Sequence, residues 1–244
     1  MKKFCIIVPI YHEDPYDYEE ISLKRLHDVI YEKNYDVFYI YPEGLNISNF
    51  LDLYNKAICM SLNEEFFIDI KAYSQLLLNY HFYNVFSDYQ YMLIYQTDSY
   101  IFRDEIEEWC NKAYDYIGAP IVSFQHIWGQ DDKETWVPKV GNGGLSLRRV
   151  CIFKDITNPD GMFYKSLNLS PELLKDIYYE DVYFCNFVNK YYIMNIPDWF
   201  EAAKFSISLN PSELYNTIDC CPMGCHNFNI HKEFWKEHGI TELF

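Results

Sequence analysis

The sequence is short of basic residues: its 244 residues include 20 Lys and Arg against 36 Asp and Glu, a formal net charge of −16. Proteins that bind the phosphate backbone of nucleic acids carry a basic face, so this balance argues against a nucleic-acid partner. Long apolar runs are also missing, and no segment approaches the roughly 20 apolar residues of a membrane-spanning helix. The eight scattered cysteines are too sparse for a disulfide scaffold and suggest free thiols in a reducing compartment.

The N-terminal segment has some features of a secretory signal. Two lysines precede an apolar run from Phe4 to Tyr11. The run is short, contains Pro9, and ends at His12 without a small-residue cleavage site. We therefore interpret it as a buried first strand. A cytoplasmic protein is expected, with peripheral association at the inner face of the membrane left open.

Aromatic side chains, by contrast, are abundant, at 19% of the residues, which excludes a disordered chain. Strand-like and helix-like stretches alternate, and this order predicts an α/β fold whose sheet is flanked by helices. Residues 123–139 read as a long polar loop, which is typically functional, and residues 205–244 are expected to be rich in loops. The predicted strands are 4–10, 36–41, 91–96 and 116–119, and the predicted helices are 21–33, 48–54, 70–80, 105–113 and 181–188.

Two short patterns follow predicted strands. Asp98 comes directly after the strand 91–96, and open α/β sheets bind ligands at the carboxyl ends of their strands. Asp98 could face a sugar hydroxyl, a ribose or a metal, or it could simply stabilise a turn. The glycines of 141–144 allow a backbone to approach a ligand closely. They match neither a P-loop nor a dinucleotide fingerprint, and a hairpin turn is the alternative.

Two further patterns lie towards the C-terminus. Glu180 and Asp181 are adjacent carboxylates, and such a pair in a cleft can raise the pKa of one member so that it serves as a general base. Acidic residues in the first turn of a helix are the ordinary alternative. The segment 220–226 contains three cysteines and His226, which could hold zinc. It has no C-x₂-C pair, so His226 could instead serve alone as a ligand of a metal held elsewhere, or be a buried histidine.

The order of these patterns resembles that of the functional motifs in GT-A-fold glycosyltransferases. The sequence is most similar to a group of uncharacterised bacterial GT-A-like proteins, through segments 96–98, 114–120, 141–148 and 180–184. The β1,3-galactosyltransferase and Fringe-like families are more distantly similar. The resemblance implies one GT-A-like (Rossmann-like) domain, residues 1–244, with a mixed, mostly parallel sheet flanked by helices. About residues 1–100 would bind the nucleotide, and about residues 101–244 would face the acceptor.

The resemblance also implies roles for individual residues on the donor side. Pro9 and Tyr11 would line the pocket for the base and ribose, and Gly143 and Gly144 would form a loop near donor and acceptor. His226 would reach a divalent cation, Mn²⁺ or Mg²⁺, and the diphosphate. The implied nucleotide-sugar-binding residues are Pro9, Tyr11, Gln96, Asp98, Gly143 and Gly144, and the implied metal ligands are Asp98 and His226.

One position departs from the Asp-x-Asp motif of the family. Aligned on Asp98, the sequence has Tyr100 at the last position, and tyrosine is a poor ligand for Mn²⁺ or Mg²⁺. Either Asp98 and His226 hold the metal through diphosphate and water, or metal dependence has weakened.

The implied activity is transfer of a sugar from a nucleotide-sugar, with a UDP-sugar favoured, to a hydroxyl of a glycan or glycolipid acceptor in bacterial polysaccharide synthesis. The reaction would invert the anomeric centre, with Asp181 as general base and Glu180 beside it. The leaving diphosphate needs positive charge, for which Lys71, Arg148 and Arg149 are candidates. A carbohydrate- or nucleotide-sugar-binding protein without turnover and a zinc-stabilised protein are the alternatives.

Overall fold

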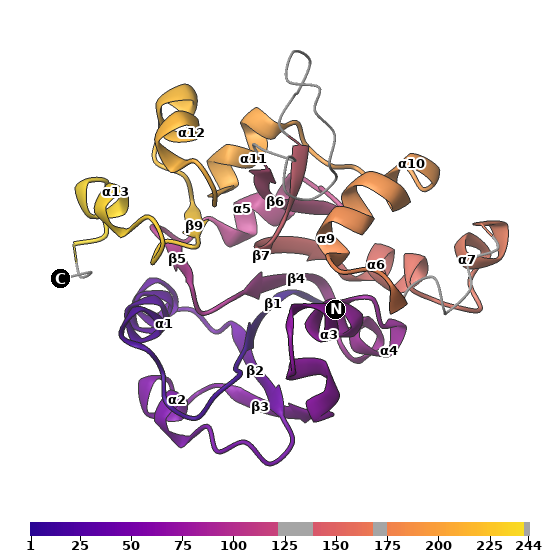
Figure 1. Ribbon diagram of the computed structural model, residues 1–244, viewed down its shortest axis with the longest axis horizontal. Coiled ribbons are helices and arrows are strands. Elements are labelled where there is room, and N and C mark those ends of the chain that lie inside the picture. The colour runs from indigo at the N-terminus through magenta and orange to yellow at the C-terminus, as the bar shows by residue number, and fades with distance from the viewer. Residues whose placement is uncertain (122–138, 168–174, 242–244) are drawn as a thin grey trace.

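The computed structural model describes residues 1–121, 139–167 and 175–241, and its centre is a six-stranded sheet of order β3-β2-β1-β4-β7-β6 (Figure 1). Strands β3, β2, β1 and β4 run parallel, whereas β7 is antiparallel to both of its neighbours. The predicted mixed, mostly parallel sheet is confirmed. The strands are β1 (Lys2–Pro9), β2 (Asp36–Pro42), β3 (Ile58–Leu62), β4 (Tyr89–Tyr95), β6 (Tyr116–Ile121) and β7 (Lys139–Arg149).

A second, three-stranded sheet has the order β5-β9-β8 and consists of β5 (Ser99–Ile101), β8 (Ser206–Ile207) and β9 (Gly224–His226). Strand β5 starts just beyond β4 and pairs antiparallel with β9, which places His226 opposite Ser99. The C-terminal segment, which was expected to be rich in loops, also contains two short strands and two helices that were not predicted. Strands of two or three residues are too short to show an alternating pattern in the sequence.

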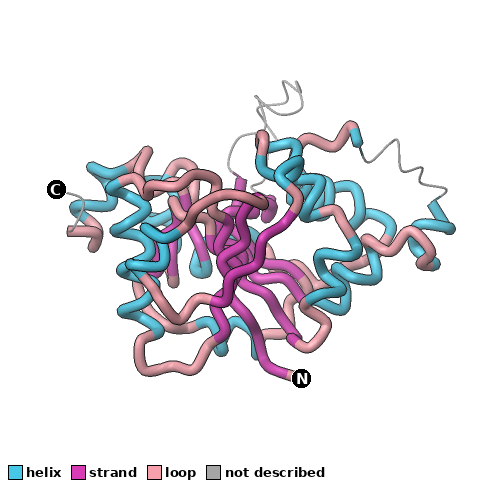
Figure 2. The backbone as a smooth tube through the Cα atoms, turned by 90° about the horizontal axis from the view of Figure 1, so that it is seen from below, coloured by secondary structure: helices cyan, strands magenta, loops and turns pink. Residues whose placement is uncertain are grey.

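Helices lie on both sides of the strands (Figure 2). None of those in the described residues is both long and apolar enough to cross a membrane. The helices are α1 (Asp17–Ile30), α2 (Ser48–Leu53), α3 (Ile70–Leu77), α4 (Tyr80–Val85), α5 (Ile106–Asn111), α6 (Val150–Ile156), α7 (Met162–Leu167), α9 (Glu180–Val182), α10 (Asn189–Tyr191), α11 (Trp199–Phe205), α12 (Pro211–Ile218) and α13 (Lys232–Glu237), with a 3₁₀ turn η1 (Glu64–Phe67) and a π-helical segment η2 (Tyr183–Val188).

Most helix boundaries differ from the predicted ones; α1, for example, spans Asp17–Ile30 where a helix over 21–33 was predicted. The predicted helix 70–80 is divided, because α3 ends at Leu77 and the side chain of Asn79 accepts a hydrogen bond from the backbone N–H of His81 to start α4. The predicted helix 181–188 begins one residue earlier and continues through η2 into α10. The predicted loop 123–139 lies almost wholly outside the described residues.

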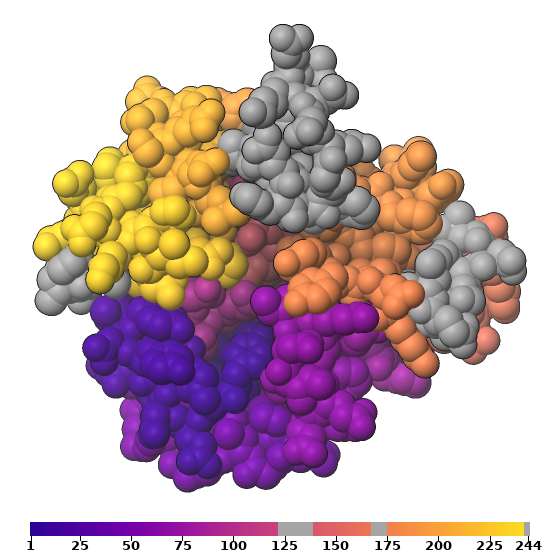
Figure 3. Space-filling model, viewed as in Figure 1, coloured from indigo at the N-terminus to yellow at the C-terminus, as the bar shows by residue number. Residues whose placement is uncertain are grey.

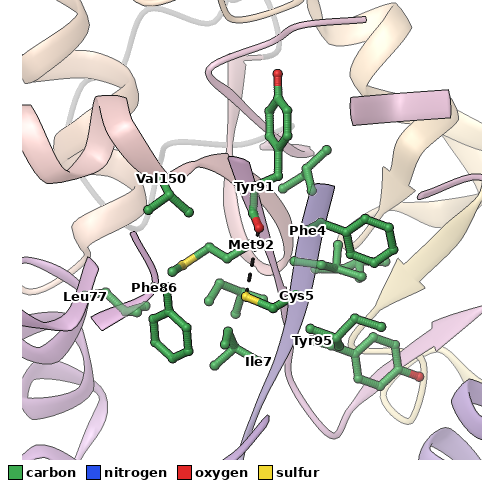
Figure 4. Packing of buried hydrophobic residues seen from close by; sticks show 14 of the residues in the cluster. Phe4, Cys5, Ile7, Leu77, Phe86, Tyr91, Met92, Tyr95 and Val150 are labelled. Atoms are coloured by element: carbon green, nitrogen blue, oxygen red, sulfur yellow. Dashed lines mark hydrogen bonds between the residues drawn. The ribbon is translucent and has the colours of Figure 1, made fainter. Parts of the chain in front are cut away.

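The main hydrophobic core packs around β1 and β4 (Figure 4). Residues Cys5 to Val8 of β1 are fully buried, which is typical of a central parallel strand covered on both faces. The thiol of Cys5 hydrogen-bonds to the carbonyl of Tyr91 on β4. A second cluster surrounds the small sheet and contains Tyr100 and Trp235. The edge where β1 and β4 end lies beside the small sheet, because β5 continues the chain from β4.

Candidate active site

A cleft of about 650 Å³ opens at the carboxyl ends of β1 and β4. Figure 3 shows a hollow near the middle of one face of the molecule. Parallel strands end at the same edge of a sheet, so segments that are far apart in the sequence meet there. The cleft is lined by residues from segments 11–19, 67–74, 96–98, 142–144, 179–181 and 226–227.

Every residue with an implied catalytic, nucleotide-sugar-binding or metal-binding role lines this cleft, except Pro9. Pro9 is the buried last residue of β1, so it lies behind the cleft wall. The chain reaches the cleft two residues later, where the ring of Tyr11 lies edge-on to the rings of Phe67 and Tyr73. The structure therefore brings together Tyr11, Gln96, Asp98, Gly143, Gly144, Glu180, Asp181 and His226.

Asp98, Gln96 and His226 form one cluster. The Nε2 atom of His226 lies 3.1 Å from Oδ1 of Asp98 and 3.0 Å from Oε1 of Gln96. The Nδ1 atom lies 3.2 Å from the hydroxyl of Ser208 and 3.0 Å from Nδ2 of Asn227. In the tautomer that carries the proton on Nδ1, the hydroxyl of Ser208 accepts it and Nε2 is free to bind a cation. Pairing of β5 with β9 produces this cluster, since it carries His226 to the turn that holds Asp98.

Tyr100, the residue that departs from the Asp-x-Asp motif, is not among the residues that line the cleft. Its side chain is buried in the second core cluster, against the rings of Phe102 and Phe228. The side chain that faces His226 together with Asp98 is instead that of Gln96, two residues earlier. The reason is that Ser99 begins β5, where side chains alternate between the two faces of the strand.

Gly143 and Gly144 lie within β7 and not in the predicted loop. A Cβ atom on Gly144 would lie 2.1 Å from Nε2 of His226, so only glycine leaves room for the imidazole. A Cβ atom on Gly143 would lie 3.0 to 3.2 Å from polar atoms of Arg148, Glu180 and Asp181. The two glycines therefore create space for side chains that come from other elements.

Asp181 is held by two backbone donors. Its Oδ2 accepts a hydrogen bond from the N–H of Gly143 at 2.7 Å, and its Oδ1 accepts one from the N–H of Val182 at 2.7 Å. Burial, followed by the charge of Glu180, raises the pKa of Asp181 to about 7, while the backbone donors and Arg148 oppose this shift. A carboxylate with such a pKa can accept a proton near neutral pH.

Glu180 forms a buried ion pair. Its Oε1 accepts a hydrogen bond from the guanidinium of Arg148 at 2.8 Å, and Arg148 is fully buried. Arg148 also donates to the hydroxyl of Tyr83 at 3.1 Å. Its charge is therefore committed to Glu180, and it does not line the cleft. Arg149 pairs with Asp115 and, like Lys71, is not among the residues that line the cleft.

The cleft carries an excess of negative charge. Five carboxylates line it, and no Lys or Arg does so in the part of the chain that the structure describes. A diphosphate would therefore require a cation to bind here. The lining carboxylates are those of Glu19, Asp69, Asp98, Glu180 and Asp181.

The cluster of Asp98, Gln96 and His226 fits a divalent cation. Carboxylate and amide oxygens with an imidazole nitrogen are ligands that Mn²⁺ accepts. The separations of about 3 Å from Nε2 are hydrogen-bond distances, so the three groups lie close enough together to bind one cation between them. Within the described ranges, no group of three or more His, Cys, Asp and Glu side chains could hold a metal. The present cluster contains only two side chains of these types, Asp98 and His226, and its third member, Gln96, is an amide.

The zinc hypothesis for segment 220–226 is not supported. Cys225 is buried and Cys220 is exposed. Cys225 and His226 are neighbours in β9, and successive side chains of a strand point to opposite faces. The cysteines therefore do not converge on the histidine.

Several cleft residues were missed in the sequence. The imidazole of His12 lies 3.1 Å from the buried carboxylate of Glu19, whose other oxygen accepts a hydrogen bond from the hydroxyl of Thr97. His12 follows β1 just as Asp98 follows β4, so the same strand-end argument could have found it. Asn227, with a φ of 57°, has no comparable signal in the sequence.

The fold is shared with solved glycosyltransferase structures. The galactosyltransferase LgtC, in complex with donor and acceptor sugar analogues, superposes with a TM-score of 0.58 at 13% identity, over 91% of this chain and 86% of that chain. Mouse xyloside xylosyltransferase 1 in its apo form superposes with a TM-score of 0.53 at 7% identity, over 92% of this chain and 97% of that chain. At these identities the likeness establishes the fold, which is that of the GT-A glycosyltransferases.

In sequence, none of the proteins with a curated description matches. Residues 56–226 match a family described as "Protein of unknown function (DUF5672)". The match covers more than half of the chain and extends from just before β3 to the cleft residue His226. The protein with this GT-A architecture and acidic cleft is thus a member of the DUF5672 family.

Proposed function

We propose that this protein is a glycosyltransferase that moves a sugar from a nucleoside diphosphate to a hydroxyl of a glycan or glycolipid. One observation carries the proposal: Asp98, Asp181 and His226 converge in the cleft at the carboxyl ends of β1 and β4. The fold is one on which glycosyl transfer occurs in the solved structures to which it is similar. Fold alone does not determine chemistry, so the cleft residues must support the reaction.

On the donor side, the proposal assigns a divalent cation to Gln96, Asp98 and His226. When bound, this cation would supply the positive charge that a leaving diphosphate needs and that the acidic lining lacks. The ring of Tyr11, which is 37% exposed, is available to stack on a nucleobase. A uridine diphosphate sugar remains the favoured donor.

On the acceptor side, the proposal makes Asp181 the general base. Its carboxylate would take the proton of the acceptor hydroxyl as the oxygen forms a bond to the anomeric carbon and the bond from that carbon to the diphosphate breaks. Glu180 acts through Asp181: its negative charge, fixed by Arg148, raises the pKa of the neighbouring carboxyl group. A base that activates the acceptor directly predicts inversion of the anomeric configuration.

The experiment is a panel of nucleotide-sugars incubated with the protein and Mn²⁺, with released nucleoside diphosphate as the readout. We expect release from at least one donor, loss of release on chelation of Mn²⁺, and at least a 100-fold lower rate for Asp181→Asn. Release by Asp181→Asn at the wild-type rate would contradict the assignment of the base. No release from any donor would contradict the proposed activity.

The second candidate is a protein that binds nucleotide-sugars without turnover. The amide of Gln96 favours it, because an amide is a weaker cation ligand than the carboxylate of an Asp-x-Asp motif. It predicts that a nucleotide-sugar binds and is recovered intact, and that Asp181→Asn binds it as tightly as the wild type. Release of diphosphate that depends on Asp181 would exclude it.

A further inference from the structure

An aromatic face extends from the cleft along the helical run that follows Asp181. The segments α9, η2 and α10 form one continuous run from Glu180 to Tyr191, coloured orange in Figure 1. An aromatic residue recurs every fourth position, at 179, 183, 187 and 191. The rings of Tyr183 and Phe187 are stacked, with centroids 5.3 Å apart, and the rings of Phe187 and Tyr191 are 5.2 Å apart. The four-residue spacing places these rings on one side of the run.

These rings line a second groove of about 650 Å³. Tyr179 is 41% exposed, Phe187 36% and Tyr191 53%. A soluble protein seldom leaves a contiguous apolar patch without a use. The polar side chains of Asp176, Asn186 and Lys190 also line the groove. Aromatic faces beside amide and ammonium donors suit a ligand that has both apolar faces and hydroxyl groups, as a sugar ring has.

The groove and the cleft share a lining residue. Tyr179 lines both of them, and it lies two residues before the proposed base Asp181. At about 1.5 Å per residue, the run from Tyr179 to Tyr191 extends for about 18 Å, which is long enough for several sugar rings. A chain whose terminal hydroxyl reaches Asp181 could therefore lie along the groove.

We propose that this groove binds the non-reacting residues of a neutral oligosaccharide acceptor, with sugar faces against Phe187 and Tyr191 and hydroxyls near Asn186. The inference rests on the proposed function for the direction of the chain, with its reacting end at Asp181. A membrane surface fits less well, since the protein has a net charge of −16 and Lys190 is the only basic residue among the described residues that line the groove.

The test measures binding of neutral gluco-, galacto- and manno-configured oligosaccharides, from disaccharides to hexasaccharides, by titration calorimetry. For wild-type protein, we expect the affinity for the best-bound series to increase with length over the first few residues. Phe187→Ala and Tyr191→Ala should each weaken binding of the tetrasaccharide about 5- to 10-fold, as expected for loss of one aromatic contact. Phe187→Leu keeps an apolar side chain and should also weaken binding. Tyr31→Ala is the matched control. It removes an exposed tyrosine that follows the C-terminal end of α1 and does not line the groove, so it should bind as the wild type does.

Four outcomes separate this inference from its alternatives. Absence of binding by every oligosaccharide, or unchanged binding by both alanine variants, would overturn it. Binding to phospholipid vesicles that the same variants lose would also overturn it and would identify a lipid surface. If the wild type binds no nucleoside diphosphate but keeps ring-dependent oligosaccharide binding, the groove stands and the transferase activity fails. If it releases diphosphate but binds no oligosaccharide, the activity stands and the groove assignment fails.

Discussion

The carboxylate of Asp181 is subject to opposing influences. Burial and the charge of Glu180 favour its protonated form, whereas the N–H groups of Gly143 and Val182 favour the ionised form. The raised pKa places its titration near neutral pH. We therefore expect the rate of diphosphate release at low donor concentration to rise as the pH increases through about 7 and then to level off. A rate that is flat from pH 5 to pH 9 would contradict the assigned base.

The same shift predicts how stability depends on pH. Because the folded-state pKa of Asp181 is raised from 3.8 to about 7, its contribution to stability is complete below about pH 4 and is lost as the pH rises to about 7. Asp181→Asn does not lose stability in this way, because its amide does not titrate. The melting temperature of the variant relative to the wild type should therefore increase between pH 4 and pH 7 and stay constant above pH 7. A difference that does not change with pH would show that the pKa is not raised.

The glycine of β7 that faces His226 offers a sharp test of the cluster. In Gly144→Ala, the new Cβ would lie 2.1 Å from Nε2, so the imidazole must move away from Asp98. We expect Mn²⁺-dependent nucleotide binding to fall at least 10-fold and the free energy of unfolding to fall by about 1–3 kcal/mol. Gly141→Ala is the control in the same strand, since the closest atom to its Cβ would be the end of the Ile121 side chain at 3.1 Å, and Cβ of Cys185 would lie at an ordinary contact distance of 3.8 Å. Equal effects of the two variants would contradict the account.

Individual cleft residues differ in how far they could be predicted. Asp98 and the pair 180–181 stand at the end of a strand and at the start of a helix, and such positions can be recognised in a sequence. The approach of Gln96 to His226 could not be predicted, because it depends on the pairing of β5 with β9. The placement of Gly143 and Gly144 within β7 depends likewise on which side chains pack against them.

At the scale of elements, the buried pair of Arg148 and Glu180 joins β7 to α9 and so fixes the start of the helical run that carries Asp181. Arg148→Met should leave Glu180 buried without its partner and lower the free energy of unfolding by about 3–5 kcal/mol. Adding Glu180→Gln should restore part of this loss, because the uncompensated charge is removed. Urea denaturation of both variants measures the effect, and a double variant less stable than Arg148→Met alone would contradict it.

Length and burial made several strands predictable, but not β7, the longest strand, because its glycines indicated a loop or a turn. Strands β1, β2 and β4 were visible as apolar runs because the sheet buries both of their faces. Strand β3 escaped notice because it lies at the edge of the sheet and most of its residues are partly or fully exposed. Strands β5, β8 and β9 are two or three residues long, so only tertiary pairing defines them.

At the scale of the whole molecule, the net charge of −16 and the acidic cleft both repel an anionic donor. With chelator present, uridine diphosphate should bind weakly, and its affinity should rise between 50 and 500 mM NaCl as salt screens the repulsion. With Mn²⁺ present, the affinity should fall over the same range, because salt then screens an attraction. Titration calorimetry at the two salt concentrations measures both trends. Equal salt dependence with and without Mn²⁺ would contradict a cation-bridged diphosphate.

The central claim is that Asp98 and His226 hold a cation and a nucleoside diphosphate in the cleft that contains Asp181. It is tested most directly by calorimetric titration of uridine diphosphate into wild-type protein and into Asp98→Asn, each with and without Mn²⁺. We predict binding to the wild type that depends on Mn²⁺, and binding to the variant that is at least 10-fold weaker. Binding by wild type and variant with the same affinity, or no binding by the wild type with Mn²⁺ present, would contradict it.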